Sequence, residues 1–158
     1  MATNDYHFIT RWRVKATIEK VAEVLSDPLD LPRWWPSVYL DVQEIEAARG
    51  DTAPTYVMYT KGRLPYTLRW QFRALPSNPP HTIALEVWGD FVGQGTWHLS
   101  QDGEWADIVY DWRIHAEKPL LRYLSFLLKP IFAANHEWAM ARGLESLQAE
   151  IARRQIGD

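Results

Sequence analysis

Alternating apolar and polar residues near the start of the chain predict a half-buried strand over residues 6–14. Phe8, Trp12 and Val14 share one side of this strand, and charged residues occupy most of the other. Apolar residues are therefore expected to cover one face of a sheet, with the charged side in water.

Residues 17–35 show helical spacing of apolar positions, and we expect two short helices there. Thr17 is a suitable N-cap, because its hydroxyl can accept a hydrogen bond from the first turn. Pro28 requires the first helix to end before it, since the residue preceding a proline disfavours the helical conformation.

From Val38 onward, turn residues interrupt β-rich runs about every dozen positions, as in an antiparallel meander. Gly93 and Gly95 lie close together inside one run, which suggests a bulge or a sharp bend. The six predicted strands cover residues 38–46, 54–61, 65–75, 82–89, 92–101 and 104–116.

A long helical segment is predicted over residues 119–154, and Pro130 should break or kink it. Before Pro130, Arg122, Ser125 and Lys129 form a narrow polar stripe on an otherwise apolar helix. After it, one face collects residues at steps of three or four, namely Phe132, His136, Met140, Gly143, Leu147 and Ile151.

This order of elements predicts a single α+β domain over residues 1–158. A curved, seven-stranded antiparallel sheet that is apolar on one face needs a cover, and the C-terminal helix is the element long enough to provide it. Bulky aromatic residues facing a helix that contains a glycine leave an uneven interface, which can enclose a cavity.

The composition of the chain argues against several classes of function. The 158 residues carry a net charge of −3 and have no basic block, so the electrostatic signature of a nucleic-acid binder is missing. The absence of cysteine excludes disulfides, thiolate metal sites and cysteine nucleophiles, and it fits a cytoplasmic location. No apolar signal core and no membrane-spanning run occurs.

Four segments, ITRWRVKATIEKVAEVLSDPLDLPRWWP, KGRLPYTLRW, GDFVGQGTWHLSQDGEWADIVYDWRI and FAANHEWAMARGLESL, together resemble the START-like, helix-grip (SRPBCC) superfamily. Within it, the chain is similar to the bacterial polyketide cyclase/dehydrase and lipid-transport family. The resemblance implies a deep apolar cavity between sheet and helix. Family members bind hydrophobic molecules such as lipids, sterols and polyketides, and some catalyse cyclisation or dehydration.

His136 is the sharpest candidate for chemistry, because the apolar stripe would point it into the cavity. It could bond a ligand, act as an acid or base, or merely hold the helix on the sheet. The stretch NHEWAM begins like the zinc motif H-E-x-x-H, but Met140 replaces the second histidine, so no metal is expected, nor any cofactor.

The residues predicted to contact a ligand are Trp70, Trp97, Tyr110, Trp112, Phe132, His136 and Met140. Ordinary core packing is the alternative role for each aromatic ring. Glu86 and Asp111 are the carboxylates within strands that could act as bases, but a catalytic role is not expected for either. Asp111 falls on the polar side of its strand. The face of Glu86 is ambiguous, since two sets of residues compete for the inner face, and the more apolar set should put Glu86 outside.

These features favour a protein that binds or carries a small hydrophobic ligand, lipid or polyketide-like. The alternative is a cofactor-independent polyketide cyclase, aromatase or dehydratase that uses His136. A third reading is an interaction module with a collapsed cavity. The apolar segment 119–132 could make transient contact with a membrane, or it could pack between the sheet edge and the body. The pattern specifies no oligomeric state.

Overall fold

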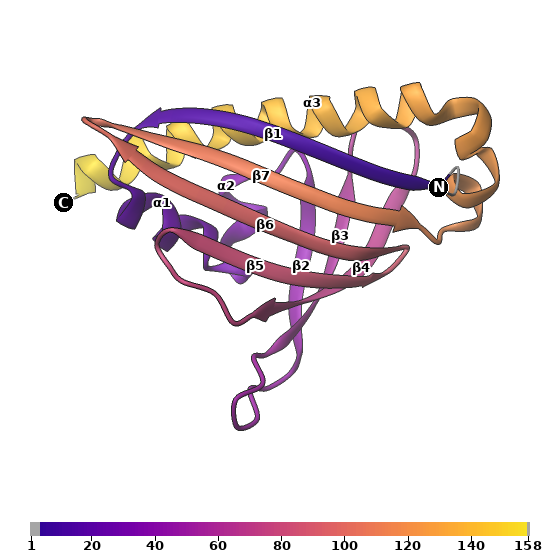
Figure 1. Ribbon diagram of the computed structural model, residues 1–158, viewed down its shortest axis with the longest axis horizontal. Coiled ribbons are helices and arrows are strands. Elements are labelled where there is room, and N and C mark those ends of the chain that lie inside the picture. Colours follow the sequence, from indigo (N-terminus) through magenta and orange to yellow (C-terminus); the bar gives the residue numbers. More distant parts are fainter. Residues whose placement is uncertain (1–3, 158) are drawn as a thin grey trace.

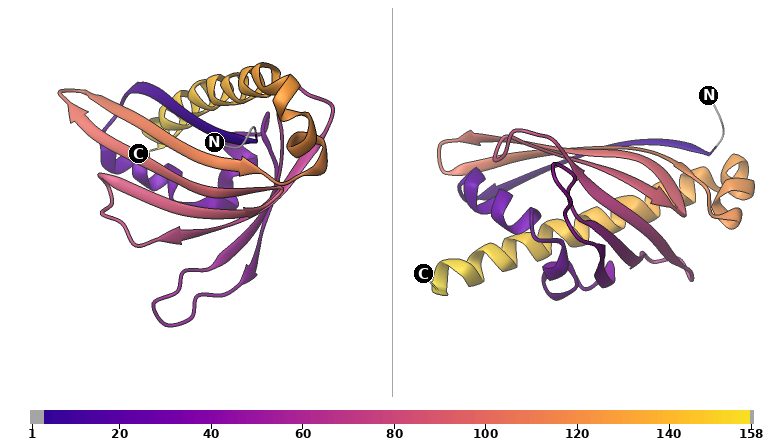
Figure 2. Two further views of the ribbon diagram at one scale, coloured as in Figure 1. Left: turned by 45° about the vertical axis from the view of Figure 1, so that its right-hand side comes forward. Right: turned by 90° about the horizontal axis from the view of Figure 1, so that it is seen from below.

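The sheet has seven antiparallel strands in the order β1-β7-β6-β5-β4-β3-β2, as the computed structural model, which describes residues 4–157, shows (Figure 1). The strands are β1 (Asp5–Lys15), β2 (Tyr39–Glu46), β3 (Thr55–Lys61), β4 (Thr67–Leu75), β5 (Thr82–Gly89), β6 (Phe91–Asp102) and β7 (Trp105–Ala116). The helices lie on one side of this curved sheet (Figure 2). The predicted helix-grip architecture is confirmed.

Three short helical elements connect β1 to β2, where two were expected. They are α1 (Ile18–Leu25), a single 3₁₀ turn η1 (Pro28–Asp30) and α2 (Leu31–Trp34). Thr17 caps α1 as predicted, since its Oγ1 accepts a hydrogen bond from Lys20 N at 3.2 Å. Pro28 ends the helical path of α1 and starts the extra turn, which suits a residue that lacks an N–H donor.

One helix, α3 (Pro119–Gly157), forms the C-terminal quarter of the chain. Of the predicted break or kink at Pro130, the break does not occur, because the helix continues through the proline. The kink does occur, since Figures 1 and 2 show that the orange N-terminal turns are bent away from the axis of the rest. A bend suits a proline inside a helix, which removes one backbone hydrogen bond while the neighbouring turns persist.

The predicted strand faces agree with the observed burial. On β1, Trp12 and Val14 are buried, whereas Arg11 and Arg13 are exposed. On β7, the inward set runs from Ala106 through Ile108, Tyr110 and Trp112. The aromatic residues of the sheet therefore gather on its concave face, toward α3.

The predicted bulge at Gly93 and Gly95 is wrong, because β6 pairs with β7 without any shift of register. The two glycines are needed for close approach instead. A Cβ atom on Gly95 would lie 2.7 Å from Tyr110 Oη and equally near the Trp112 ring. Glycine at this position lets both aromatic rings lie flat across β6.

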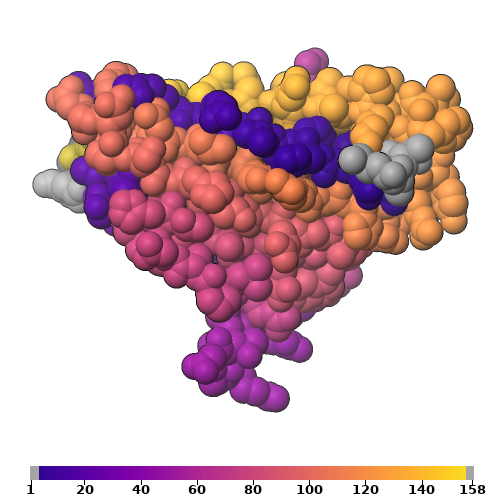
Figure 3. Space-filling view, viewed as in Figure 1, coloured from indigo at the N-terminus to yellow at the C-terminus, as the bar shows by residue number. Residues whose placement is uncertain are grey.

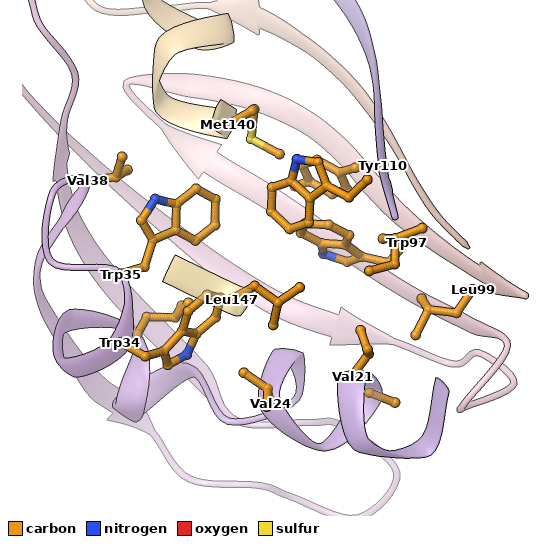
Figure 4. Packing of buried hydrophobic residues seen from close by; sticks show 14 of the residues in the cluster. Val21, Val24, Trp34, Trp35, Val38, Trp97, Leu99, Tyr110, Met140 and Leu147 are labelled. Carbon is orange, nitrogen blue, oxygen red and sulfur yellow. The ribbon is translucent and has the colours of Figure 1, made fainter. Parts of the chain in front are cut away.

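The C-terminal part of α3 packs on the concave face through its apolar stripe. Leu147 is fully buried, and Met140 and Ile151 are nearly so. A Cβ atom on Gly143 would lie 2.3 Å from Trp35 Cζ2, so the absence of a side chain there admits the indole. Figure 4 shows Trp35, Met140 and Leu147 together in this core.

The hairpin that joins β2 and β3 projects from the body of the molecule (Figures 1 and 3). It lies at the edge of the sheet and carries the exposed side chains Leu40 and Ile45 on β2. The enclosed volume therefore lies away from this tip, between the sheet's concave face and α3.

Candidate functional site

A cavity of about 150 Å³ lies between the concave face of the sheet and α3. The structure brings all seven predicted ligand-contacting residues to its wall, namely Trp70, Trp97, Tyr110, Trp112, Phe132, His136 and Met140. Figure 4 shows Trp97, Tyr110 and Met140 pointing into the space between sheet and helix. Their contact with a ligand stays a prediction.

Several further wall residues were not singled out from the sequence. Phe8 lies on the side of the first strand that was expected to face inward. Tyr66 and Leu68 alternate with Thr67 and Arg69 in the predicted strand 65–75, so a signal for them existed too. Trp35 and Tyr39 reach the cavity from α2 and the start of β2. No periodicity in the sequence indicated their position.

The sheet side of the cavity is a continuous layer of aromatic rings. Trp97 and Tyr110 stack with ring centroids 3.9 Å apart, and Tyr110 and Trp112 stack at 5.4 Å. Trp70 and Phe91 continue the layer, with centroids 5.0 Å apart. Such a surface favours flat or flexible apolar molecules, because ring faces offer large contact area at little entropic cost.

A second cavity of about 50 Å³ lies on the far side of this aromatic layer. Trp35, Tyr39, Trp70, Trp97 and Tyr110 line both cavities, so these side chains form the partition between them. The two cavities are therefore neighbours that share one wall.

His136 comes from the middle of α3 and stacks on Phe8 of β1, with ring centroids 4.1 Å apart. Its Nε2 is buried and has no hydrogen-bond partner among the residues whose side chains the structure describes. Burial lowers the pKa of His136 from its ordinary 6.5 to about 4, so the imidazole is neutral near pH 7. A neutral imidazole offers one donor and one acceptor to a partner.

Other polar side chains of the wall come from four tyrosines and from Thr60, Lys61 and Asn135. Trp70 Nε1 is satisfied by Thr60 Oγ1 at 3.0 Å, whereas the buried Nε1 of Trp35 has no partner in the described part of the chain. Burial also raises the pKa of the Tyr110 phenol well above its ordinary range. Among the wall residues, the imidazole nitrogen of His136 and the indole N–H of Trp35 are thus buried polar atoms without a partner in the described chain.

Asn135, beside His136, ties α3 to the loop between β3 and β4. Its Oδ1 accepts hydrogen bonds from the backbone N–H groups of Arg63 at 2.6 Å and Leu64 at 3.4 Å. A Cβ atom on Gly62 would lie 2.2 Å from the same oxygen. Asn135 and Gly62 both line the cavity, so this contact forms part of its wall, and no pattern in the sequence predicted it.

The two strand carboxylates lie away from the cavity, as their parity indicated. Glu86 accepts a hydrogen bond from Arg73 at 2.9 Å, and Asp111 accepts one from His7 at 2.8 Å. None of the described residues that line the cavity is Asp or Glu. Within residues 4–157, no three His, Asp or Glu side chains lie close enough together to hold a metal ion.

Comparison with solved structures supports the fold. The chain is similar to the Zhui aromatase/cyclase of a Streptomyces species, with 18% identity, a TM-score of 0.73 and 95% of each chain covered. It is also similar to a START superfamily protein of Mycobacterium smegmatis, with 13% identity, a TM-score of 0.75, and 93% of this chain and 97% of that one covered. A conserved protein of Geobacillus kaustophilus matches with 15% identity, a TM-score of 0.73, and coverage of 94% and 96%.

No curated protein sequence matches the chain. At such low identities the structural matches establish the fold alone. The family comparison goes further, because the sequence model for polyketide cyclase/dehydrase and lipid transport matches residues 7–152, nearly the whole chain. The chain belongs to the polyketide cyclase/dehydrase and lipid transport family.

Proposed function

We propose that the protein binds or carries a small hydrophobic molecule, lipid or polyketide-like, in the cavity between the sheet and α3. One observation carries the proposal. An aromatic-walled cavity contains a buried imidazole nitrogen, His136 Nε2, that has no partner in the described protein. An unpaired buried polar atom costs about 1–3 kcal/mol, which a ligand bearing a hydrogen-bonding group would recover.

The volume of the cavity limits the ligand. About 150 Å³ suits a molecule of roughly one or two rings. A longer acyl chain or a larger polyketide requires the partition of Trp97 and Tyr110 to move, which joins the second cavity. The family description supports both ligand classes, and the similar aromatase/cyclase supports the polyketide-like one.

Native mass spectrometry of gently purified protein tests the proposal directly, because a retained hydrophobic compound would appear as added mass. Titration with a two-ring phenol, a medium-chain fatty acid and a sterol, followed by tryptophan fluorescence, extends the test. Trp97, Trp112 and Trp70 line the cavity, so a bound ligand should change their emission. A panel without any binder, and no co-purified compound, would overturn the proposal.

A matched pair of variants locates the binding. Ala139 lies on the cavity wall, whereas Ala134 is exposed on the same helix. Ala139→Phe should fill the cavity and weaken binding at least about tenfold, since a buried ligand needs the displaced volume. Ala134→Phe should leave the affinity unchanged. Equal effects of both variants would place the ligand elsewhere.

Catalysis by His136 is the competing function, favoured by the presence of one imidazole in the cavity. With its pKa near 4, His136 is a weak base at neutral pH, and no carboxylate lines the cavity to assist it. Binding therefore has the stronger support. With a polyketide-like substrate that turns over, His136→Ala should abolish the reaction while tryptophan quenching persists. Unchanged turnover would exclude His136 from catalysis.

A further inference from the structure

The first turns of α3 expose apolar side chains to solvent. We define the outer face of α3 as the five large side chains that are between 43% and 70% exposed, namely Leu120, Tyr123, Phe126, Leu127 and Ile131. Most are spaced by three or four residues and so lie along one side of the helix. Figure 2 shows these orange turns at one end of the molecule, bent from the rest of α3.

Two residues of the polar stripe, Ser125 and Lys129, are directed into the protein. Ser125 is fully buried, and its Oγ lies 2.7 Å from Tyr6 Oη. Lys129 donates to the backbone carbonyl of Asp5, and its Nζ lies 4.9 Å from the centroid of the Tyr6 ring. Together with the inward-packed Leu121, Leu124 and Leu128, these contacts hold the inner side of the segment on the protein and leave the outer face in water.

Positive charge borders the outer face. No acidic residue occurs from position 118 to position 136, although the whole chain has a net charge of −3. Lys118 and Arg122 lie four residues apart, so they share one border of the face. Arg63 adds a cation near the far end, because its backbone bonds Asn135, one turn beyond Ile131.

We propose that the outer face of α3 docks on the surface of an anionic phospholipid bilayer. Aromatic and aliphatic side chains would enter the headgroup boundary, and the bordering cations would meet lipid phosphates. The segment would lie in the interface, because no helix in residues 4–157 is long and apolar enough to cross a membrane.

A second copy of the chain suits this face less well. In a two-fold contact the same patch meets itself, so Lys118 and Arg122 would approach their own copies. Glu117 and Asp90 already interact with these two cations, Glu117 with Arg122 at 3.6 Å and Asp90 with Lys118 at 3.9 Å. An anionic surface would attract the cations that border the outer face, whereas the same cations on a second copy would repel them.

The outer face of α3 lies on the same helical turns that form part of the cavity wall. Leu121 and Phe132 line the cavity from the inner side of the turns whose outer side carries Phe126 and Leu127. Docking would therefore place one end of the cavity next to the bilayer. The proposal goes beyond ligand binding, and it holds for any ligand that the cavity takes.

Vesicle flotation tests the proposal with the full chain and no added ligand. Wild-type protein should float with vesicles of phosphatidylcholine mixed with phosphatidylglycerol, and less with phosphatidylcholine alone. The double variant Phe126→Ser/Leu127→Ser should lower the partition coefficient at least about tenfold, because it removes two of the three most exposed side chains of the outer face. Added salt should weaken the binding of the wild type.

The matched control is Leu40→Ser/Ile45→Ser, which removes two exposed apolar side chains from β2 and should leave flotation unchanged. Circular dichroism confirms that each variant is folded. Two results would overturn the proposal. The first is that wild-type protein fails to float with anionic vesicles; if it is then a dimer that the Phe126→Ser/Leu127→Ser variant dissociates, the outer face binds a second copy instead. The second is that the control reduces flotation as much as the test variant does.

Discussion

The two parts of α3, before and after Pro130, differ in what they leave exposed. From Phe132 to Ile151, apolar side chains face the sheet and polar ones face water. From Leu120 to Ile131, Leu121, Leu124 and Leu128 pack inward beside the buried Ser125, yet the five large side chains of the outer face lie in water. One continuous helix thus combines an ordinary amphipathic part with a part that carries apolar side chains on both sides.

The difference teaches that helical periodicity identifies a stripe without saying which way it faces. The direction is decided by the surface opposite the helix. The C-terminal part meets an apolar concave face that accepts Leu147, whereas the N-terminal part meets Tyr6 and a backbone carbonyl of β1, which bond Ser125 and Lys129.

A leucine-to-alanine substitution should change the free energy of unfolding very differently in the two parts of the helix, and this is the largest difference that we expect. Leu147→Ala removes a fully buried side chain from the main core and should lower the free energy of unfolding by about 3–5 kcal/mol. Leu127→Ala removes a side chain that is already exposed and should change it by less than about 0.5 kcal/mol. Urea unfolding followed by circular dichroism measures both. Similar losses would mean that the outer face is buried in solution.

His136 lies near the junction of the two parts and should make stability depend on pH. Its folded pKa is near 4 and its unfolded pKa near 6.5, so between these values the unfolded chain binds the additional proton. Stability should therefore fall as the pH decreases from about 6.5 to about 4, by about 3 kcal/mol in total. Urea unfolding at several pH values measures the slope.

The control for this prediction is His136→Phe, which keeps a ring stacked on Phe8 and removes the titration. Its stability should decrease less than that of the wild type over the same pH interval. Equal slopes would show that the imidazole is not desolvated in the folded protein, and they would remove the physical basis for an unpaired nitrogen in the cavity.

Much of the fold follows from local signals in the sequence. Alternation places Trp12, Trp70 and Trp112 on the inner face, and Thr17 marks the start of α1. Gly95 was misread as a bulge signal, because a glycine that admits a neighbouring ring looks the same in sequence as one that bends a strand. Whether a ring packs against the glycine depends on side chains of another strand, and these cannot be recognised from the sequence next to the glycine.

The candidate site also contains both residues that the sequence predicted and residues that it did not. The inward position of His136 and Met140 was predictable because their helical stripe is unambiguous. Asn135 was not, since its partners lie in a loop some seventy residues earlier in the chain. The partition between the two cavities also depends on side-chain rotamers, and no sequence pattern encodes them.

Each part of α3 buries one polar side chain, and the two should differ in their effect on stability. In the C-terminal part, Glu150 is 4% exposed and bonds Arg153, Arg33 and Arg154, which hold its pKa well below its ordinary value. Glu150→Gln should cost about 2–3 kcal/mol, because it leaves several cations without their shared carboxylate. The loss is measured by urea unfolding near pH 7.

The matched control is Glu145→Gln on the same helix. Glu145 pairs with Arg142 at 2.7 Å, but both side chains are substantially exposed, so the cost should stay below about 0.5 kcal/mol. Because the pKa of Glu150 is depressed, its contribution should be complete above about pH 5 and decline in more acidic solution. A Glu150→Gln variant as stable as the Glu145→Gln variant would refute the anchoring role of Glu150.

The smallest effect should come from the buried polar group of the N-terminal part. Ser125→Ala removes the hydrogen bond to Tyr6 and should lower the free energy of unfolding by about 1 kcal/mol. Phe126→Ser, at the next position, should change it by less than about 0.5 kcal/mol, since that ring is in water. A polar residue would then stabilise the fold more than the aromatic residue beside it. The reverse order in urea unfolding would mean that Phe126 is buried in solution, and the outer face would then be unable to dock on a membrane.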